Sequence, residues 1–434
     1  MKPRMRTLTA AVIAISACSG AYAGELEDRI QMLEKELEAL KAAVSSNQSN
    51  IETNQADIEE ARPSKKGTRF QYGGYIQLDA NASSYSDGQS SFYASEDLLV
   101  PSTIPVEPLS GESDSYTSTN MHAKSSRFYF TTETDTDAGK VSSRIELDFI
   151  LTGDDNDERI SNSWNSRIRH AFVKWDYGQD SSLLAGQSWS TFFNVGALPD
   201  LIDFVGPVGT IFNRQPQVRW THGGLQLAVE NAVTRLNGVE WDDSHEGIPD
   251  LVARYNGTYG DLNWSVAGIV RELTYELRTD PAIEDASDEE FGYGLSLSGK
   301  WMFGKDDLRF MVNYGDALGR YMGLNSYNDG YVTADGSIET IDQWGAFVAY
   351  RHFWSPKWRS TFSLSASGAD NPDNSDFAGA DGLAESYQSL HANLNYLPTE
   401  KMAIGGEFIY ATKELEDGRD GDLSRLQFAV KYAF

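Results

Sequence analysis

The sequence predicts an all-β transmembrane protein: a 16-stranded antiparallel outer-membrane β-barrel preceded by an N-terminal α-helical coiled coil. Three observations predict this fold class. Apolar and polar residues alternate in many segments after residue 69, short and long connections alternate between these segments, and a heptad repeat precedes them. A strand with one apolar and one polar face suits a barrel wall, because the apolar face meets lipid while the polar face lines the lumen.

The last strand shows the alternation clearly. Leu426, Phe428, Val430, Tyr432 and Phe434 fall on one face, and mostly polar or small residues fall on the other. A terminal aromatic residue on such a strand resembles the C-terminal signature of bacterial outer-membrane barrels. We therefore expect the strand that ends in Phe434 to be engaged by the barrel assembly machinery, and the barrel to sit among outer-membrane lipids.

Sixteen segments have strand character. They lie near residues 70–80, 126–134, 139–150, 167–177, 182–190, 214–222, 225–232, 250–258, 262–272, 291–303, 306–315, 342–353, 357–368, 386–397, 401–413 and 423–434. Arg169 and His170 break the phase of one segment, which predicts a β-bulge there. An even strand count places both ends of the barrel on the periplasmic side, and 16 strands predict a water-filled interior.

The connections between these segments differ in length in a regular way. Long polar connections at 81–125, 191–213, 273–290 and 316–341 are separated by short turns. Outer-membrane barrels have this pattern, with short periplasmic turns and long external loops. No apolar run of about 18 residues follows the N-terminus, so the sequence predicts no membrane-spanning helix.

The N-terminus has the features of a secretory signal at residues 1–23. Basic residues precede a short apolar core, and Ala21-Tyr22-Ala23 fits a cleavage site. The alternative is acylation at Cys18, whose preceding residues resemble a lipoprotein cleavage box. Cys18 is the only cysteine, so cleavage after Ala23 leaves a mature chain without disulfides.

Residues 24–60 predict a periplasmic coiled coil, because apolar residues recur at heptad spacing. The seam consists of Leu26, Ile30, Leu33, Leu37, Leu40, Val44, Asn47, Ile51, Asn54 and Ile58. A strict heptad favours a coil over a solitary amphipathic helix, whose apolar stripe would follow a 3.6-residue period. The coil predicts an oligomer. Residues 61–68 form a polar linker before the barrel at 69–434.

Charge is distributed unevenly. The net charge is −28, yet twelve basic residues against six acidic ones share the phase of the predicted lumen face. Basic groups in a narrow pore favour anions, although Arg–Glu pairs that stiffen the wall are the alternative role for about half of them. We expect the pore-lining, anion-binding residues to include Arg127, Arg144, Arg169, Arg219, Arg254, Arg271, Lys300, Arg309, Arg351 and Arg359.

The connection 191–213 is unusually apolar for an external loop. Such a loop either folds into the lumen as a constriction or packs at a subunit contact. We favour the lumen. The predicted constriction residues are Leu198, Asp200, Asp203 and Phe204.

These features together resemble the DcaP-like family of trimeric outer-membrane porins over essentially the whole mature chain. The resemblance rests on the signal, the coil, the segments 70–79 (Phe-Gln-Tyr-Gly-Gly-Tyr-Ile-Gln-Leu-Asp) and 186–192 (Gly-Gln-Ser-Trp-Ser-Thr-Phe), and Phe434. It implies a homotrimer and diffusive uptake of small anions, notably dicarboxylic and aromatic acids.

Other functions find less support in the sequence. The six histidines show no metal-ligand spacing and no G-x-S-x-G motif occurs, so we expect no enzyme, metal or cofactor. A barrel-embedded lipid hydrolase and a structural or adhesive barrel are the alternatives. We expect no nucleic-acid partner.

Overall fold

The computed structural model describes residues 67–111, 113–151, 161–239, 244–245, 247–276 and 287–434, together with Lys35, Glu38 and Lys41. The chain divides into two units, Met1–Gly67 and Thr68–Phe434, and the second is the barrel. The predicted signal, coiled coil and most of the linker lie outside the described residues, apart from those three, which are helical and exposed. Among the described residues, no helix is long and apolar enough to cross a membrane.

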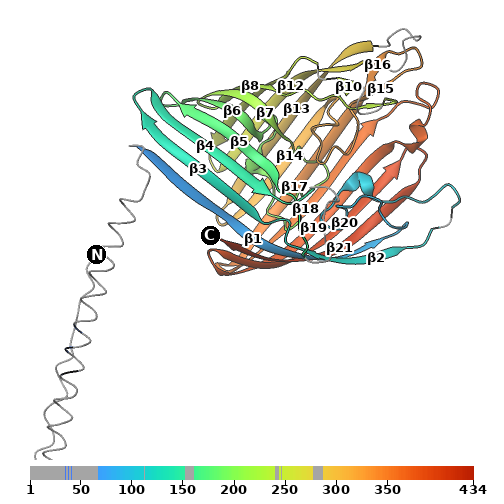
Figure 1. Cartoon of the computed structure of the whole chain (residues 1–434). Helices are drawn as coiled ribbons and strands as arrows, with labels where there is room; N and C mark the ends of the chain where they lie inside the picture. Colours follow the sequence, from blue (N-terminus) through green and yellow to red (C-terminus); the bar gives the residue numbers. More distant parts are fainter. Residues whose placement is uncertain are drawn as a thin grey trace, which may run out of the picture. The chain divides into compact units, whose positions relative to one another are not determined.

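Sixteen antiparallel strands of the described chain close into the barrel drawn in Figure 1. They are β1 (Thr68–Tyr85), β3 (Arg127–Thr136), β4 (Gly139–Asp148), β5 (Arg167–Asp176), β6 (Ser181–Trp189), β7 (Arg214–His222), β8 (Leu225–Glu230), β11 (Asp250–Tyr259), β12 (Leu262–Glu276), β13 (Ser287–Phe303), β14 (Asp306–Asp316), β17 (Asp342–Ser355), β18 (Trp358–Asp370), β19 (Ala384–Thr399), β20 (Met402–Leu415) and β21 (Asp420–Ala433). Every one of the 16 predicted segments is a barrel strand, so the barrel prediction is confirmed.

Closure depends on the first strand. The half of β1 from Thr68 to Tyr75 pairs with β3, and the half from Tyr75 to Tyr85 pairs with β21. Each other barrel strand pairs with the next barrel strand along the chain. The barrel therefore has no free edge, which satisfies the backbone polar groups within a membrane.

In the connections that the structure describes, five short strands and three 3-10 turns were not predicted. The strands are β2 (Tyr116–His122), β9 (Leu236–Asn237), β10 (Ser244–His245), β15 (Gly330–Val332) and β16 (Ile338–Thr340), and the turns are η1 (Pro101–Thr103), η2 (Val195–Ala197) and η4 (Ala380–Gly382). Strand β2 changes the barrel wall most, because it pairs with the half of β1 that also pairs with β21, on the other edge of β1.

The predicted bulge is present in β5. Glu146 of β4 pairs with His170, whereas the next residue, Leu147, pairs with Ile168, so Arg169 is the extra residue. A bulge re-aims the side chain it carries. Arg169 is 2% exposed and lies between two carboxylates of β4.

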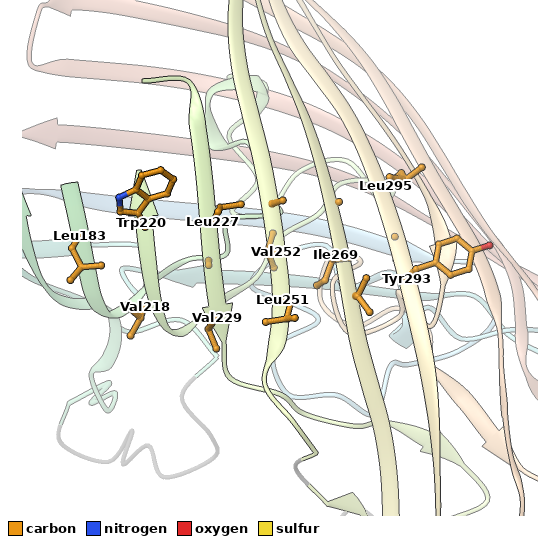
Figure 2. A pocket seen from close by; sticks show the side chains of 15 residues that line it. Leu183, Val218, Trp220, Leu227, Val229, Leu251, Val252, Ile269, Tyr293 and Leu295 are labelled. Carbon is orange, nitrogen blue, oxygen red and sulfur yellow. The ribbon is translucent and has the colours of Figure 1, made fainter. Parts of the chain in front are cut away.

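The outer face of the barrel is apolar, as the alternation predicted. Leu251, Val270 and Leu295 are each about half exposed and lie on neighbouring strands. Figure 2 shows Leu251, Leu295 and similar side chains of β6 to β13 around a groove of about 760 Å³, which Val270 also lines. In a membrane, acyl chains would cover this face. Trp354 and Trp358 flank a short turn at one end of the wall, as in an aromatic girdle.

The interior of the barrel is partly filled by the chain itself. Three connecting segments, which we call segments 94–104, 190–213 and 317–329, contribute to one buried apolar cluster. The members from these segments are Leu99, Ile104, Phe192, Phe193, Ala197, Val208, Ile211, Leu318, Tyr321, Met322 and Tyr327. Two connections predicted as polar external loops, 81–125 and 316–341, thus bury apolar residues and take up part of the interior that was expected to be water-filled.

Segments 190–213 and 317–329 are joined by backbone hydrogen bonds. Phe212 N–H donates to Tyr321 O over 3.1 Å, and Gly323 N–H donates to Thr210 O over 2.8 Å. Ile211 and Met322 form a β-bridge between the same segments. The two segments therefore fold inward as one unit.

Candidate functional site

The lumen-facing wall holds segment 190–213 through polar contacts from several strands. Gly209 N–H donates to Ser365 Oγ of β18 over 2.8 Å, and Asn194 Nδ2 donates to Ser298 Oγ of β13 over 3.0 Å. Arg254 of β11 donates to the carbonyl oxygen of Phe193 over 2.7 Å. The segment thus lies against the inner wall from β11 to β20.

Glu407 of β20 also holds this segment, through two of its backbone N–H groups. Its carboxylate accepts hydrogen bonds from the backbone of Ile202 (2.6 Å) and Asp203 (3.4 Å), and from the side chains of His391 and Asn393 (both 3.0 Å). Glu407 is 1% exposed, so these charge-assisted bonds are made in a region of low dielectric. Segment 190–213 is therefore fixed at its centre.

Asp203 continues this chain of contacts into segment 94–104. Its carboxylate accepts from Leu99 N–H over 2.9 Å and from Gly206 N–H over 3.0 Å. Burial raises the pKa of the Asp203 carboxyl above its usual range. Asp203 was predicted to lie at the constriction, but its side chain is buried between two segments and does not face an open pore.

A first cluster of basic side chains lies on β3, β4, β5 and the start of β7. Its members are Arg127, Arg144, Arg167, Arg169 and Arg214. Two buried carboxylates lie among them. Arg169 contacts Glu146 at 2.8 Å and Asp148 at 2.6 Å, and Arg167 contacts Asp148 at 3.0 Å. Five guanidinium groups therefore face two carboxylates.

Part of this first arginine cluster is open to solvent. The side chains of Arg127, Arg144 and Arg167 are 24%, 30% and 26% exposed. Arg214 has no carboxylate partner among the described residues and stacks on Trp189, with its guanidinium carbon 4.2 Å from the ring centroid. Exposed guanidinium groups in excess of their acids can bind an anion in the lumen.

A second cluster lies near the short-turn ends of β13, β14, β17 and β18. Its members are Lys300, Arg309, Arg351 and Arg359, together with the carboxylates of Asp307 and Asp200. Arg359 Nε lies 2.7 Å from Asp200, and Arg309 Nε lies 2.7 Å from Asp307. Four basic groups therefore face two acids. Because Asp200 belongs to segment 190–213, its ion pairs connect this segment to the second arginine cluster.

The remaining predicted constriction residues also contact basic side chains. Arg309 donates to the carbonyl oxygen of Leu198. The ring of Phe204 lies 5.3 Å from the guanidinium carbon of Arg169. Segment 190–213 thus contacts a member of each arginine cluster.

Some residues predicted to line the pore have structural roles instead. Arg271 is 1% exposed, and its Nη1 donates to Asp329 (2.7 Å) and to Ala317 O (2.8 Å), which anchors segment 317–329. Its assignment to an open pore is wrong, because a segment unforeseen from the sequence covers it. Arg169 is likewise buried. Arg219 and Lys300 lie partly exposed on the inner face.

The sequence analysis missed several members of these clusters. Arg167 lies beyond the bulge, where the alternation loses its phase, and Arg214 lies at a strand end. Asp307 shares the phase of Arg309 on β14, so strict alternation could have identified it. No local pattern indicated that Asp329 would meet Arg271, since 58 residues separate them.

Comparison with solved structures gives the same fold. The outer membrane channel DcaP of Acinetobacter baumannii is similar with a TM-score of 0.68 and 22% identity, over 86% of this chain and 99% of that chain. An anion-selective porin from Comamonas acidovorans (TM-score 0.51) and the trimer form of OmpT from Vibrio cholerae (0.50) are each 10% identical, over 85% of this chain and 100% of theirs. A search of curated proteins gives no match.

The family comparison covers nearly the whole sequence. The model of the DcaP outer membrane protein family matches residues 25–434, which include the entire described barrel. The closed 16-stranded barrel and its apolar outer wall agree with an outer-membrane location. The chain therefore belongs to the DcaP outer membrane protein family.

Proposed function

We propose that the protein is a homotrimeric porin through which small anions, in particular organic acids such as dicarboxylates, enter by diffusion. The observation that carries this proposal is the excess of guanidinium groups in the two arginine clusters. A permeating ion passes close to these groups, whereas charges further than about 8–10 Å are largely screened at physiological salt. The acidic loops therefore affect the electrostatic potential in the lumen less than the net charge of −28 suggests.

The chemistry of arginine supports carboxylates as the favoured ions. A guanidinium group binds a carboxylate through two parallel hydrogen bonds and stays charged at any physiological pH. Arg144 and Arg167 each keep part of their donor surface free although each contacts an acid. The anion selectivity stated for the Comamonas acidovorans porin agrees with this proposal. The proposal itself rests on the excess of basic over acidic groups in the two arginine clusters.

The reversal potential of single channels in a salt gradient tests the preference. We expect the wild type to prefer anions and the variant Arg127→Gln, Arg144→Gln, Arg359→Gln to lose most of that preference, above all at low salt. A matched control neutralises Arg419, Lys305 and Lys401, which lie in turns between strands, and should behave as the wild type. Cation preference of the wild type would overturn the proposed cargo.

The trimer is supported by the outer wall of β1, β3 and β4. Thr68 and Thr134 share a hydrogen bond of 2.8 Å, and Thr132 and Ser143 share one of 2.7 Å, on the face that is apolar elsewhere. Hydroxyl groups gain nothing from lipid, but they suit a contact between copies. The heptad seam at 24–60, proposed to lie in the periplasm after removal of residues 1–23, would add a second contact. Native mass measurement should show three chains.

The alternative of a lipid hydrolase would need a catalytic serine–histidine pair. The described residues bring one such pair within hydrogen-bond distance, but its surroundings do not suit catalysis. Ser181 Oγ and His222 Nδ1 lie 2.8 Å apart at an exposed turn. No described carboxylate orients this histidine, and a hydrolytic triad needs that third group. The pair is a cross-strand contact between β6 and β7.

A further inference from the structure

Lys431 lies on the inner face of β21, whereas its neighbours Val430 and Tyr432 are exposed on the outer face. The strands of this part of the wall follow in the order β18, β19, β20, β21, β1 and β3. Arg359 of the second arginine cluster is on β18 and Arg127 of the first is on β3, so strand spacings of about 4.8 Å separate their backbones by about 24 Å along the wall. Lys431 lies between the two clusters.

Lys431 and Arg127 contact the same aromatic ring. Tyr75 of β1 pairs with Arg127 of β3 and, on the other edge of β1, with Ala433 of β21. Lys431 Nζ is 3.8 Å from the centroid of the Tyr75 ring, and the guanidinium carbon of Arg127 is 5.2 Å from the same point. The two charged groups are therefore at most about 9 Å apart, which is similar to the screening distance of about 8–10 Å at physiological salt.

Lys431 is also close to the second arginine cluster. It interacts electrostatically with Asp200 and Arg359, which form an ion pair at 2.7 Å. Segment 190–213 lies against the wall at this point, because Asn393 of β19 donates to the backbone oxygen of Asp200 over 2.9 Å. The segment thus places an acid in the stretch between Lys431 and Arg359, and these two basic groups offset its charge.

The ammonium group of Lys431 is not neutralised by an ion pair. Within the part of the chain that the structure describes, no carboxylate lies at ion-pair distance from it. Asp79 of the neighbouring strand accepts instead from the amides of Gln77 (2.8 Å) and Gln427 (3.1 Å). The face of an aromatic ring attracts a cation without cancelling its charge. The ammonium group on Tyr75 therefore keeps its donors for an anion in the lumen.

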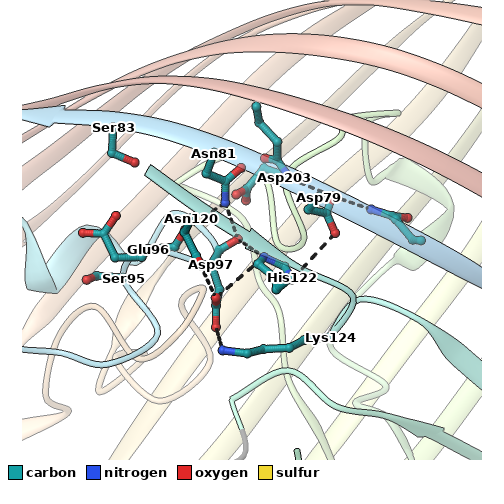
Figure 3. Close-up of polar contacts among 12 residues, drawn as sticks. Asp79, Asn81, Ser83, Ser95, Glu96, Asp97, Asn120, His122, Lys124 and Asp203 are labelled. Atoms are coloured by element: carbon teal, nitrogen blue, oxygen red, sulfur yellow. Dashed lines mark hydrogen bonds and ion pairs between the residues drawn. The ribbon is translucent and has the colours of Figure 1, made fainter. Parts of the chain in front are cut away.

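The other basic side chains nearby are engaged with segment 94–104. Figure 3 shows Lys124 directed at a carboxylate of this segment, which lies 2.6 Å from Nζ. Arg425 of β21 and Lys413 of β20 donate to backbone oxygens of the same segment. Lys431 is therefore the one lysine or arginine of β20 and β21, both described in full, that donates no hydrogen bond to the chain.

We propose that Lys431 joins the two arginine clusters into one path for anions through the lumen. An anion that leaves the first arginine cluster at Arg127 meets the field of Lys431 before that of Arg127 is fully screened, and it then reaches Arg359. Without Lys431, this stretch holds the acid Asp200 and no free basic group. The inference rests on the proposed function and names the residue that attracts the anion between the two clusters.

Single-channel conductance tests this role of Lys431. A unit charge about 9 Å away changes the local concentration of a monovalent anion about twofold even at the dielectric constant of water. Lys431→Gln should therefore lower the conductance about twofold or more at low salt, and less at high salt, where the charge is screened. Lys431→Arg keeps the charge and should conduct as the wild type. Lys401→Gln removes the same charge from an exposed turn and should also conduct as the wild type. Wild-type conductance in Lys431→Gln at low salt would overturn the path.

Chemical modification separates the charge from any effect on folding, because one protein is measured before and after the reaction. In a Cys18→Ser background, Lys431→Cys carries the only thiol of the chain. A positively charged methanethiosulfonate should raise its low-salt conductance towards the wild-type value, and a negatively charged one should lower it further. Equal effects of the two reagents, or a thiol that neither reaches, would overturn the path. Cation preference in the reversal potential of the wild type would instead contradict the proposed function.

Discussion

Replacement of Glu407 tests how segment 190–213 is kept inside the barrel. Glu407→Met preserves the length of the side chain but removes the acceptor for the backbone N–H groups of Ile202 and Asp203. Each buried donor left without a partner costs about 1–3 kcal/mol, so the segment should lose about 2–6 kcal/mol of its attachment. Glu407→Gln keeps one oxygen and should lose about 1–3 kcal/mol.

The expected result is graded. The strand ladder of the barrel does not involve these side chains, so the barrel should still fold while segment 190–213 leaves the inner wall for part of the time. Single-channel recordings should then show higher conductance and more open-channel noise in the order wild type, Glu407→Gln, Glu407→Met. Glu385→Gln, an exposed acid at the start of β19, is the matched control. Wild-type conductance and noise in Glu407→Met would refute the anchoring role.

Three further predictions concern the wall, the interior and the N-terminal region. Ile145→Arg places a charge on the lipid face and should cost about 2–4 kcal/mol in denaturant unfolding, whereas Ser142→Arg, on the inner face of β4, should be tolerated; equal costs would mean the strand phase is wrong. Arg271→Met should cost about 3–5 kcal/mol, because Asp329 stays buried without its partner, and Asp329→Asn in the same chain should recover part of the loss. Deletion of residues 25–60 should lower the melting temperature of the trimer in gels and leave conductance nearly unchanged, since the coil is proposed to lie outside the pore.

Local chemistry explains why the strands could be predicted. A strand in a barrel wall must present one face to lipid, so Leu426, Phe428 and Val430 repeat with a period of two whatever the rest of the chain does. The alternation of short and long connections arises from the two sides of the membrane. The bulge in β5 could also be predicted, because the adjacent polar residues Arg169 and His170 cannot both fit the alternation of apolar and polar side chains.

The predicted site was less complete, because its residues depend on partners far away in the sequence. The phase placed Arg127 and Arg144 on the predicted lumen face, where both contact the buried Glu146, and the apolar character of 191–213 suggested a position inside the barrel. It could not show that Asp203 would be buried against Leu99, 104 residues earlier in the chain. Nor could it separate exposed arginines from those covered by other segments.

Residue order alone was enough to establish the number of strands, the face each one turns to lipid and the surplus of basic residues on the other face, because these depend on neighbours two residues apart. Which arginines remain open in the lumen became clear only in the folded chain. That outcome depends on which segments fold inward and on single contacts across the barrel, such as Arg271 with Asp329 and Glu407 with Ile202. Long-range contacts of this kind leave no period in the sequence, since each joins two positions that nothing local connects.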